Sequence, residues 1–169
     1  MSFVPFADLP DDARIWIFGA GGPLPPAVAE RLLRGVQSFV DRWTAHGSPV
    51  VGSFDWRYDT FLVVAADEAA TGVSGCSIDS LYHTLKQLEE ETGITLLDSS
   101  RVWYRDELDA VRSVTREDFR GMVEREEVGD ETMVFDNTAR TVGALRAGEW
   151  ERPFHESWHV RAFPSARSR

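Results

Sequence analysis

The chain is poor in cysteine and lysine, and it contains neither a long apolar run nor a nucleotide-binding loop. One cysteine among 169 residues cannot form a disulfide within the chain, and a single thiol agrees with a reducing, cytoplasmic location. No apolar run approaches the roughly 18 residues of a membrane helix, and the N-terminus has no secretory-signal pattern. Only Lys86 is a lysine, and the absence of GxxxxGK[ST] excludes a Walker A loop.

Charge of one sign dominates the composition. There are 28 acidic and 18 basic residues, which gives a net charge of −10, and every basic residue except Lys86 is an arginine. Such a surface repels phosphate backbones and anionic lipids, so we expect neither nucleic acid nor membrane as a partner. The expected partner is therefore a small molecule or another protein. Acidity with little lysine suits high salt, where charge repulsion is screened, and suits a GC-rich genome equally well.

Hydrophobic and aromatic residues are plentiful enough for a packed core. They make up 43% and 11% of the chain, which excludes a disordered protein, a collagen and a coiled coil. We predict a single α+β domain over residues 1–163, followed by a disordered polar tail at 164–169.

Hydrophobic periodicity predicts strands and helices in alternation. Residues 61–66 are apolar throughout and predict a buried strand, whereas Leu32 and Val36 belong to a helical stripe. Ser77 is predicted to cap the second helix. The expected order is strand, helix, strand, strand, helix, strand, over residues 15–18, 27–44, 50–56, 60–66, 77–92 and 102–104. This order is typical of a ferredoxin-like split βαβ (βαββαβ) core.

The rest of the chain adds elements beyond that core. A third helix is expected at about 116–127, with Thr115 and Asp118 at its start, and a last strand at 133–135. The tail that follows is rich in aromatic residues and must pack on the domain, because otherwise it would expose a large apolar patch. Those residues are Trp150, Phe154, Trp158 and Phe163.

The predicted topology brings two loops to one edge of the sheet. The loop at 46–49 carries His46, and the loop at 74–79 carries the only thiol, Cys76, at the start of a helix. Unpaired amides and the helix dipole favour a thiolate there. We therefore predict Cys76 as a nucleophile or redox centre and His46 as its base or counter-ion. A lone cysteine is more often a small buried hydrophobe, and this alternative stays open.

Further side chains complete the candidate site. Asp79 or His159 is predicted to be the catalytic residue that orients this pair. Small residues before the second helix would let backbone amides approach a ligand, although the same residues suit a plain strand-to-helix turn. The candidate ligand-binding residues are Ser74, Gly75, Ser77, Asn137 and Trp158. No CxxC occurs, and residues 155–159, although they have the spacing HExxH, follow Pro153 among aromatic residues and are not expected to form the regular helix that such a site needs, so we predict no metal site and no cofactor.

Several segments together resemble a known family. They are Pro5-Phe6, Ala13–Ile17, Trp43–Gly47, Ser74–Ser80, Phe135–Asn137 and Ser157–His159. Over roughly residues 3–163 the chain resembles an uncharacterised bacterial family, seen mostly in Bacteroidetes, whose hallmarks are an HG and a GCSID segment. Its members often carry the label of an ABC transporter ATPase, which the missing Walker A loop contradicts. The resemblance implies a soluble cytoplasmic protein and carries over no activity.

Two functions are therefore expected from the sequence. The first is a small-molecule enzyme with a cysteine-centred site at the loop edge of the sheet. The second is a non-enzymatic module that binds a ligand or a protein, since a sheet of this kind often exposes one face to a partner.

Overall fold

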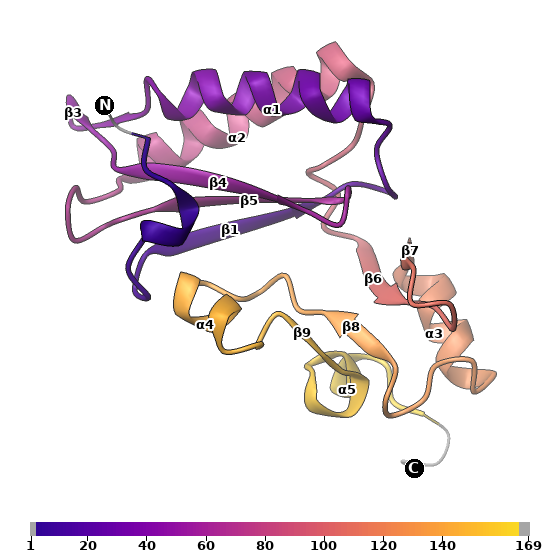
Figure 1. The fold of residues 1–169 in the computed structure, drawn as a ribbon. Coiled ribbons are helices and arrows are strands. Elements are labelled where there is room, and N and C mark those ends of the chain that lie inside the picture. Colours follow the sequence, from indigo (N-terminus) through magenta and orange to yellow (C-terminus); the bar gives the residue numbers. More distant parts are fainter. Residues whose placement is uncertain (1–2, 166–169) are drawn as a thin grey trace.

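Mixed α and β structure in layers is seen in the computed structural model, which describes residues 3–165 (Figure 1). The elements run in the order η1 (Phe6–Asp8), β1 (Arg14–Gly19), α1 (Pro26–Val40), β2 (Thr44–Ala45), β3 (Ser48–Pro49), β4 (Gly52–Arg57), β5 (Phe61–Ala66), α2 (Gly75–Thr92), β6 (Arg101–Arg105), β7 (Val111–Thr115), α3 (Arg116–Glu124), β8 (Met133–Phe135), α4 (Val142–Arg146), β9 (Glu151–Pro153), η2 (Phe154–Glu156) and α5 (His159–Ala162). The α+β class is confirmed.

The first sheet has the antiparallel order β1-β5-β4 and carries α1 and α2 on one face (Figure 1). Its central strand, β5, is fully buried along its length. Leu62 and Val64 pack in the core under the two helices, whereas Phe61 and Val63 point to the opposite layer. Because successive side chains of a strand alternate between faces, an uninterrupted apolar run fits a strand covered on both sides.

Local sequence signals fix the ends of the two long helices. Pro25 precedes α1 and the helix ends at Val40, earlier than the predicted range. For α2 the predicted cap is wrong by three residues: Ser74 is the N-cap, and Ser77 forms the reciprocal capping box with it. Cys76 therefore lies inside the first turn of the helix. Gly93, with φ 72°, ends α2 in the left-handed conformation.

A second sheet forms the layer on the other side of the first. Its strand order is β7-β6-β8-β9, and α3 and α5 lie beside it (Figure 1). The predicted last strand corresponds to β8, and Thr115 caps α3 by accepting from the Asp118 amide, as expected. The aromatic tail packs as predicted, with Trp150, Phe154 and Phe163 buried. The two layers meet through a cluster of Phe61, Trp103, Val111, Phe135 and Trp150.

The full ferredoxin-like strand order is not found. β1, β4 and β5 have the relative positions expected for the first three strands, but β6 pairs with β7 and β8 instead of β1. The edge of β1 is partly occupied already, because the Ile15 amide donates to the Arg140 carbonyl. Trp103 of β6 lies against Gly19 and donates its indole N–H to the Ala20 carbonyl, so β6 meets the end of β1 through a side chain.

The described residues contain no helix that is long and apolar enough to cross a membrane. Of the tail predicted to be disordered, residues 166–169 lie outside the described part of the chain.

Candidate functional site

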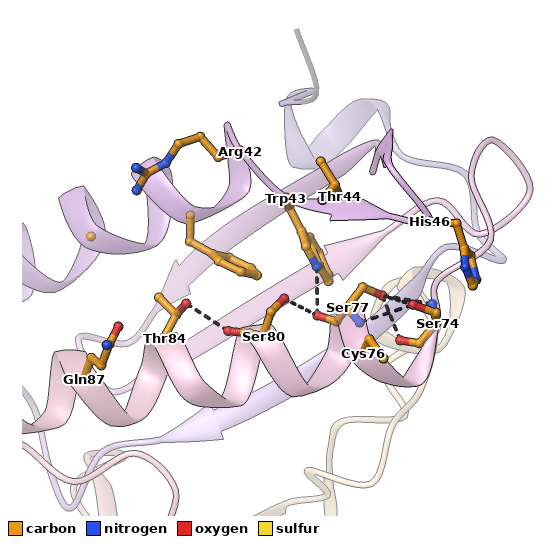
Figure 2. A pocket seen from close by; sticks show the side chains of 12 residues that line it. Arg42, Trp43, Thr44, His46, Ser74, Cys76, Ser77, Ser80, Thr84 and Gln87 are labelled. Atoms are coloured by element: carbon orange, nitrogen blue, oxygen red, sulfur yellow. Dashed lines mark hydrogen bonds between the residues drawn. The ribbon is translucent and has the colours of Figure 1, made fainter.

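A pocket of about 560 Å³ opens between α1 and α2, at the end where α1 leads into β2 and α2 begins (Figure 2). One wall is aromatic and comes from Phe39 and Trp43. Trp43 is buried, and its indole N–H donates to the Ser77 carbonyl at 2.9 Å, which ties the end of α1 to the start of α2. A site of this volume, with an apolar wall and a few fixed polar groups, suits a small organic molecule.

The wall formed by α2 is a row of hydroxyl groups (Figure 2). Ser77, Ser80 and Thr84 follow one another at steps of three and four, which places them on one side of the helix. The Ser80 hydroxyl donates to the Ser77 carbonyl at 2.7 Å, and the Thr84 hydroxyl donates to the Ser80 carbonyl at 2.9 Å. Since these protons are already used, the oxygens are left to accept hydrogen bonds from a ligand.

The charge of the pocket contrasts with that of the chain. None of the described lining residues is acidic, although the chain carries a net charge of −10. Arg42 lines one end and His46 the other (Figure 2). The Arg42 Nε donates to the Ser38 carbonyl, and no described carboxylate pairs with its terminal nitrogens. A guanidinium without a carboxylate partner, in a pocket lined by no carboxylate, favours an anionic ligand.

His46 and Cys76, predicted from the topology to be neighbours, line this same pocket. His46 lies in a tight turn with φ 52° and is exposed, and the free thiol of Cys76 is exposed in the first turn of α2. The structure shows no hydrogen bond to the thiol from any described residue, so the imidazole and the thiol are not paired. Ser74 and Ser77 also line the pocket, whereas Gly75 is exposed beside it.

Asp79 does not line this pocket. It is exposed and is not among the lining residues. Asp79 follows Ser77 by two positions, which is a rotation of about 200° around an α-helix, so the two side chains leave α2 on opposite sides. Asp79 follows Cys76 by three positions, which makes them neighbours on the helix surface, and its role as the orienting group stays a prediction.

His159 is also placed elsewhere. It is 1% exposed in the C-terminal layer, where its ring stacks on Trp158 with centroids 3.9 Å apart and contacts Phe119. The Ser157 hydroxyl and Nδ1 of His159 share a hydrogen bond of 2.7 Å. Burial lowers the pKa of this imidazole to about 4, so it is neutral at pH 7. The prediction that it orients the catalytic pair is wrong, because the hydrophobic effect draws it into a separate core.

Asn137 and Trp158 were assigned to the same ligand site from the sequence, and the structure separates them from it. The Asn137 amide oxygen accepts from the indole N–H of Trp150 at 2.9 Å. The Trp158 indole N–H donates to the Asp136 carboxylate at 3.1 Å. Both side chains therefore hold the C-terminal layer together.

Part of the pocket lining was not predicted from the sequence. Arg42, Ser80, Thr84 and Gln87 line the pocket and were not singled out. A signal was present: the polar residues of α2 recur at the same three- and four-residue steps as its buried leucines, on a neighbouring face. A row of small hydroxyls beside an apolar stripe marks a helix face that turns toward another helix.

Within residues 3–165, no three His, Cys, Asp or Glu side chains gather closely enough to hold a metal ion. No family model, no curated protein and no solved structure matches the chain. The resemblance to the bacterial family with HG and GCSID segments therefore stays a prediction.

Proposed function

We propose that the chain binds a small anionic molecule carrying hydroxyl or amine groups, in the pocket between α1 and α2. The observation behind this proposal is the lining: Arg42 and His46 with no described carboxylate, in a strongly acidic chain. The acidic surface of the chain would repel an anionic ligand elsewhere. A pocket without carboxylates is therefore a place where such a ligand can bind.

Each wall of the pocket has a distinct part in this binding. The Arg42 guanidinium attracts a carboxylate or phosphate. The hydroxyl oxygens of Ser80 and Thr84 accept from donors on the ligand, because their own protons are held by helix carbonyls. Phe39 and Trp43 cover the apolar part of the molecule.

Isothermal titration calorimetry with glycerol 3-phosphate, and with glycerol as the uncharged comparison, tests the proposal. We expect the phosphate ester to bind and glycerol to bind much more weakly. Arg42→Gln should weaken binding by about tenfold or more, because a charge-assisted hydrogen bond contributes about 1.5–3 kcal/mol. Arg31→Gln is the matched control, since Arg31 is exposed on α1 outside the pocket. Equal losses in the two variants, or equal binding of the two compounds, would contradict the proposal.

A second candidate function is cysteine-dependent catalysis in the same pocket. The specific observation is an exposed, free thiol in the first turn of α2 that lines the same pocket as His46. Ligand binding would bring the thiol and the imidazole to bear on one molecule. Alkylation of Cys76 by iodoacetate should then slow markedly in His46→Asn, because the imidazole would contact the anionic reagent bound beside the thiol. An unchanged rate would argue against this second function.

A further inference from the structure

One edge of the first sheet is covered over only half its length. β1 is an outer strand, and the segment before α4 pairs with its beginning (Figure 1). The Ile15 amide donates to the Arg140 carbonyl and the Val142 amide donates to the Ala13 carbonyl, both at 2.9 Å. This short antiparallel pairing fills the place of a fourth strand, but it stops after Ile15.

A turn ends the pairing. The Ala139 amide donates to the Asp136 carbonyl at 3.1 Å, and the Asp136 carboxylate accepts from the Thr138 amide at 3.0 Å. These contacts close residues 136–139 into a turn, so the chain leaves the sheet edge where antiparallel pairing would otherwise continue beside Ile17.

The backbone of Ile17 is open at this edge. Successive residues of a strand direct their N–H and C=O groups to alternate sides. Ile15 faces the edge, as its bond to Arg140 shows, whereas the Ala20 amide bonds to the Thr60 carbonyl at the side of β5. Ile17 and Gly19 therefore face the edge, and among the described residues no hydrogen bond to the backbone of either is seen. Gly19 is buried against Trp103, so Ile17 is the residue whose backbone is left open.

A groove follows this open backbone. Two adjoining hollows of about 380 and about 140 Å³ share Ile17, Phe18, Tyr82 and Asn137. Tyr82 of α2 forms one side, where it is 43% exposed and its ring meets Phe18 edge-on at 5.5 Å. Asn137 forms the other side, and the bond from the Trp150 indole to its oxygen leaves its NH₂ free to donate.

We infer that this groove binds an extended segment of a partner polypeptide, which adds to the sheet as a strand beside β1. Backbone pairing with Ile17 holds the segment at the sheet edge, and Tyr82 and Asn137 contact its side chains. The edge lies between two walls, so a narrow peptide fits it better than the sheet edge of a second copy. This inference is independent of the pocket between α1 and α2.

Charge at one end of the groove specifies the segment further. Arg14 and Arg140 line it where β1 begins. Arg14 has Glu68 as a partner at 3.2 Å, whereas no described carboxylate pairs with Arg140. In an antiparallel arrangement the C-terminal end of the added strand points toward the beginning of β1, where Arg140 lies. The partner segment is therefore extended, with acidic side chains toward its C-terminal end.

The experiment uses the full chain, labelled with ¹⁵N, and a blocked peptide of alternating threonine and valine that ends in two aspartates. With millimolar peptide, amide hydrogen exchange at Ile17 should slow by about tenfold or more, because pairing removes that N–H from water. Exchange at Ile15 should change little, since its amide is already bonded. The same peptide with alternate backbone nitrogens methylated, which cannot pair, should leave Ile17 unchanged.

Variants separate charge recognition from folding. Arg140→Gln should weaken peptide binding by about fivefold, whereas Arg31→Gln on α1 should have no effect. The inference is overturned if the peptide leaves Ile17 exchange unchanged, or if the methylated peptide binds equally well. It is also overturned if Ile17 is already protected without peptide, for example in dimers detected by sedimentation.

Discussion

The buried imidazole of His159 should make the protein sensitive to mild acid. The ring is 1% exposed and lies against Trp158 and Phe119. Loss of solvation lowers its pKa to about 4, and Arg116 adds to this effect while Asp136 opposes it. In the unfolded chain a histidine has a pKa near 6.5. The unfolded state therefore binds a proton on acidification before the folded state does.

This difference gives stability a definite dependence on pH. Because the folded pKa lies below the unfolded one, the stabilisation is complete above about pH 6.5 and is lost as the pH falls toward 4. Proton linkage between pH 7.5 and pH 5 gives a loss of about 2 kcal/mol from this one group. His155 acts in the opposite direction, since its bond to the Asp130 carbonyl raises its pKa and stabilises the fold on acidification.

Urea unfolding at pH 7.5 and pH 5 measures the effect, and His159→Gln isolates it. Glutamine does not titrate and can still bond to the Ser157 hydroxyl. Between the two pH values the free energy of unfolding of the parent chain should fall by about 2 kcal/mol more than that of His159→Gln. This difference does not depend on how much the substitution itself destabilises the protein at pH 7.5. His155→Gln should instead lose stability more steeply than the parent. If the parent and His159→Gln show the same pH dependence, the imidazole is not held neutral by burial and the reasoning fails.

Three further predictions concern close packing and capping, and thermal unfolding checks each. Gly19→Ala should destabilise by about 1–3 kcal/mol, because its Cβ would lie 2.4 Å from the anchored ring of Trp103; an unchanged melting temperature would refute this contact. The free energy of unfolding of Gly35→Ala should stay within about 1 kcal/mol of the parent's, because the atom opposite the new Cβ is a Leu88 methyl that can rotate away and because alanine favours a helix. A loss as large as that of Gly19→Ala would contradict this. Thr115→Ala should cost about 1 kcal/mol through loss of the α3 cap, and no loss would mean that the cap does not matter.

Local patterns predicted most elements, because the signals for them are local. The helical stripe of α1, the apolar run of β5 and the cap of α3 all lie within single elements. Pairing partners carry no such signal. Val102 and Trp103 of β6 are buried. Buried apolar residues suit a strand paired with the outer edge of β1 and a strand in a separate sheet equally well. Only the later segment around Arg140, which occupies the β1 edge, decides between these arrangements.

Two other misses have different physical causes. β7 was not predicted because its polar residues Arg112 and Ser113 interrupt the apolar pattern, yet Ser113 serves the fold by donating to the Gly21 carbonyl. His159 was assigned to the site as a possible orienting group for the histidine and cysteine pair. Its burial depends on aromatic residues that come from several parts of the chain, which no local window shows.

The helix α2 serves both candidate sites, and its periodicity keeps them apart. Ser80 faces the pocket beside α1, whereas Tyr82, two residues later, faces the groove along β1. A separation of two residues is a rotation of about 200°, so the two side chains act on opposite sides of the helix. Ser80→Ala should therefore weaken binding of the small anion without affecting the peptide, and Tyr82→Ala should do the reverse. A variant on one side that impaired both would mean that the sites share one conformational change in α2 instead of acting separately.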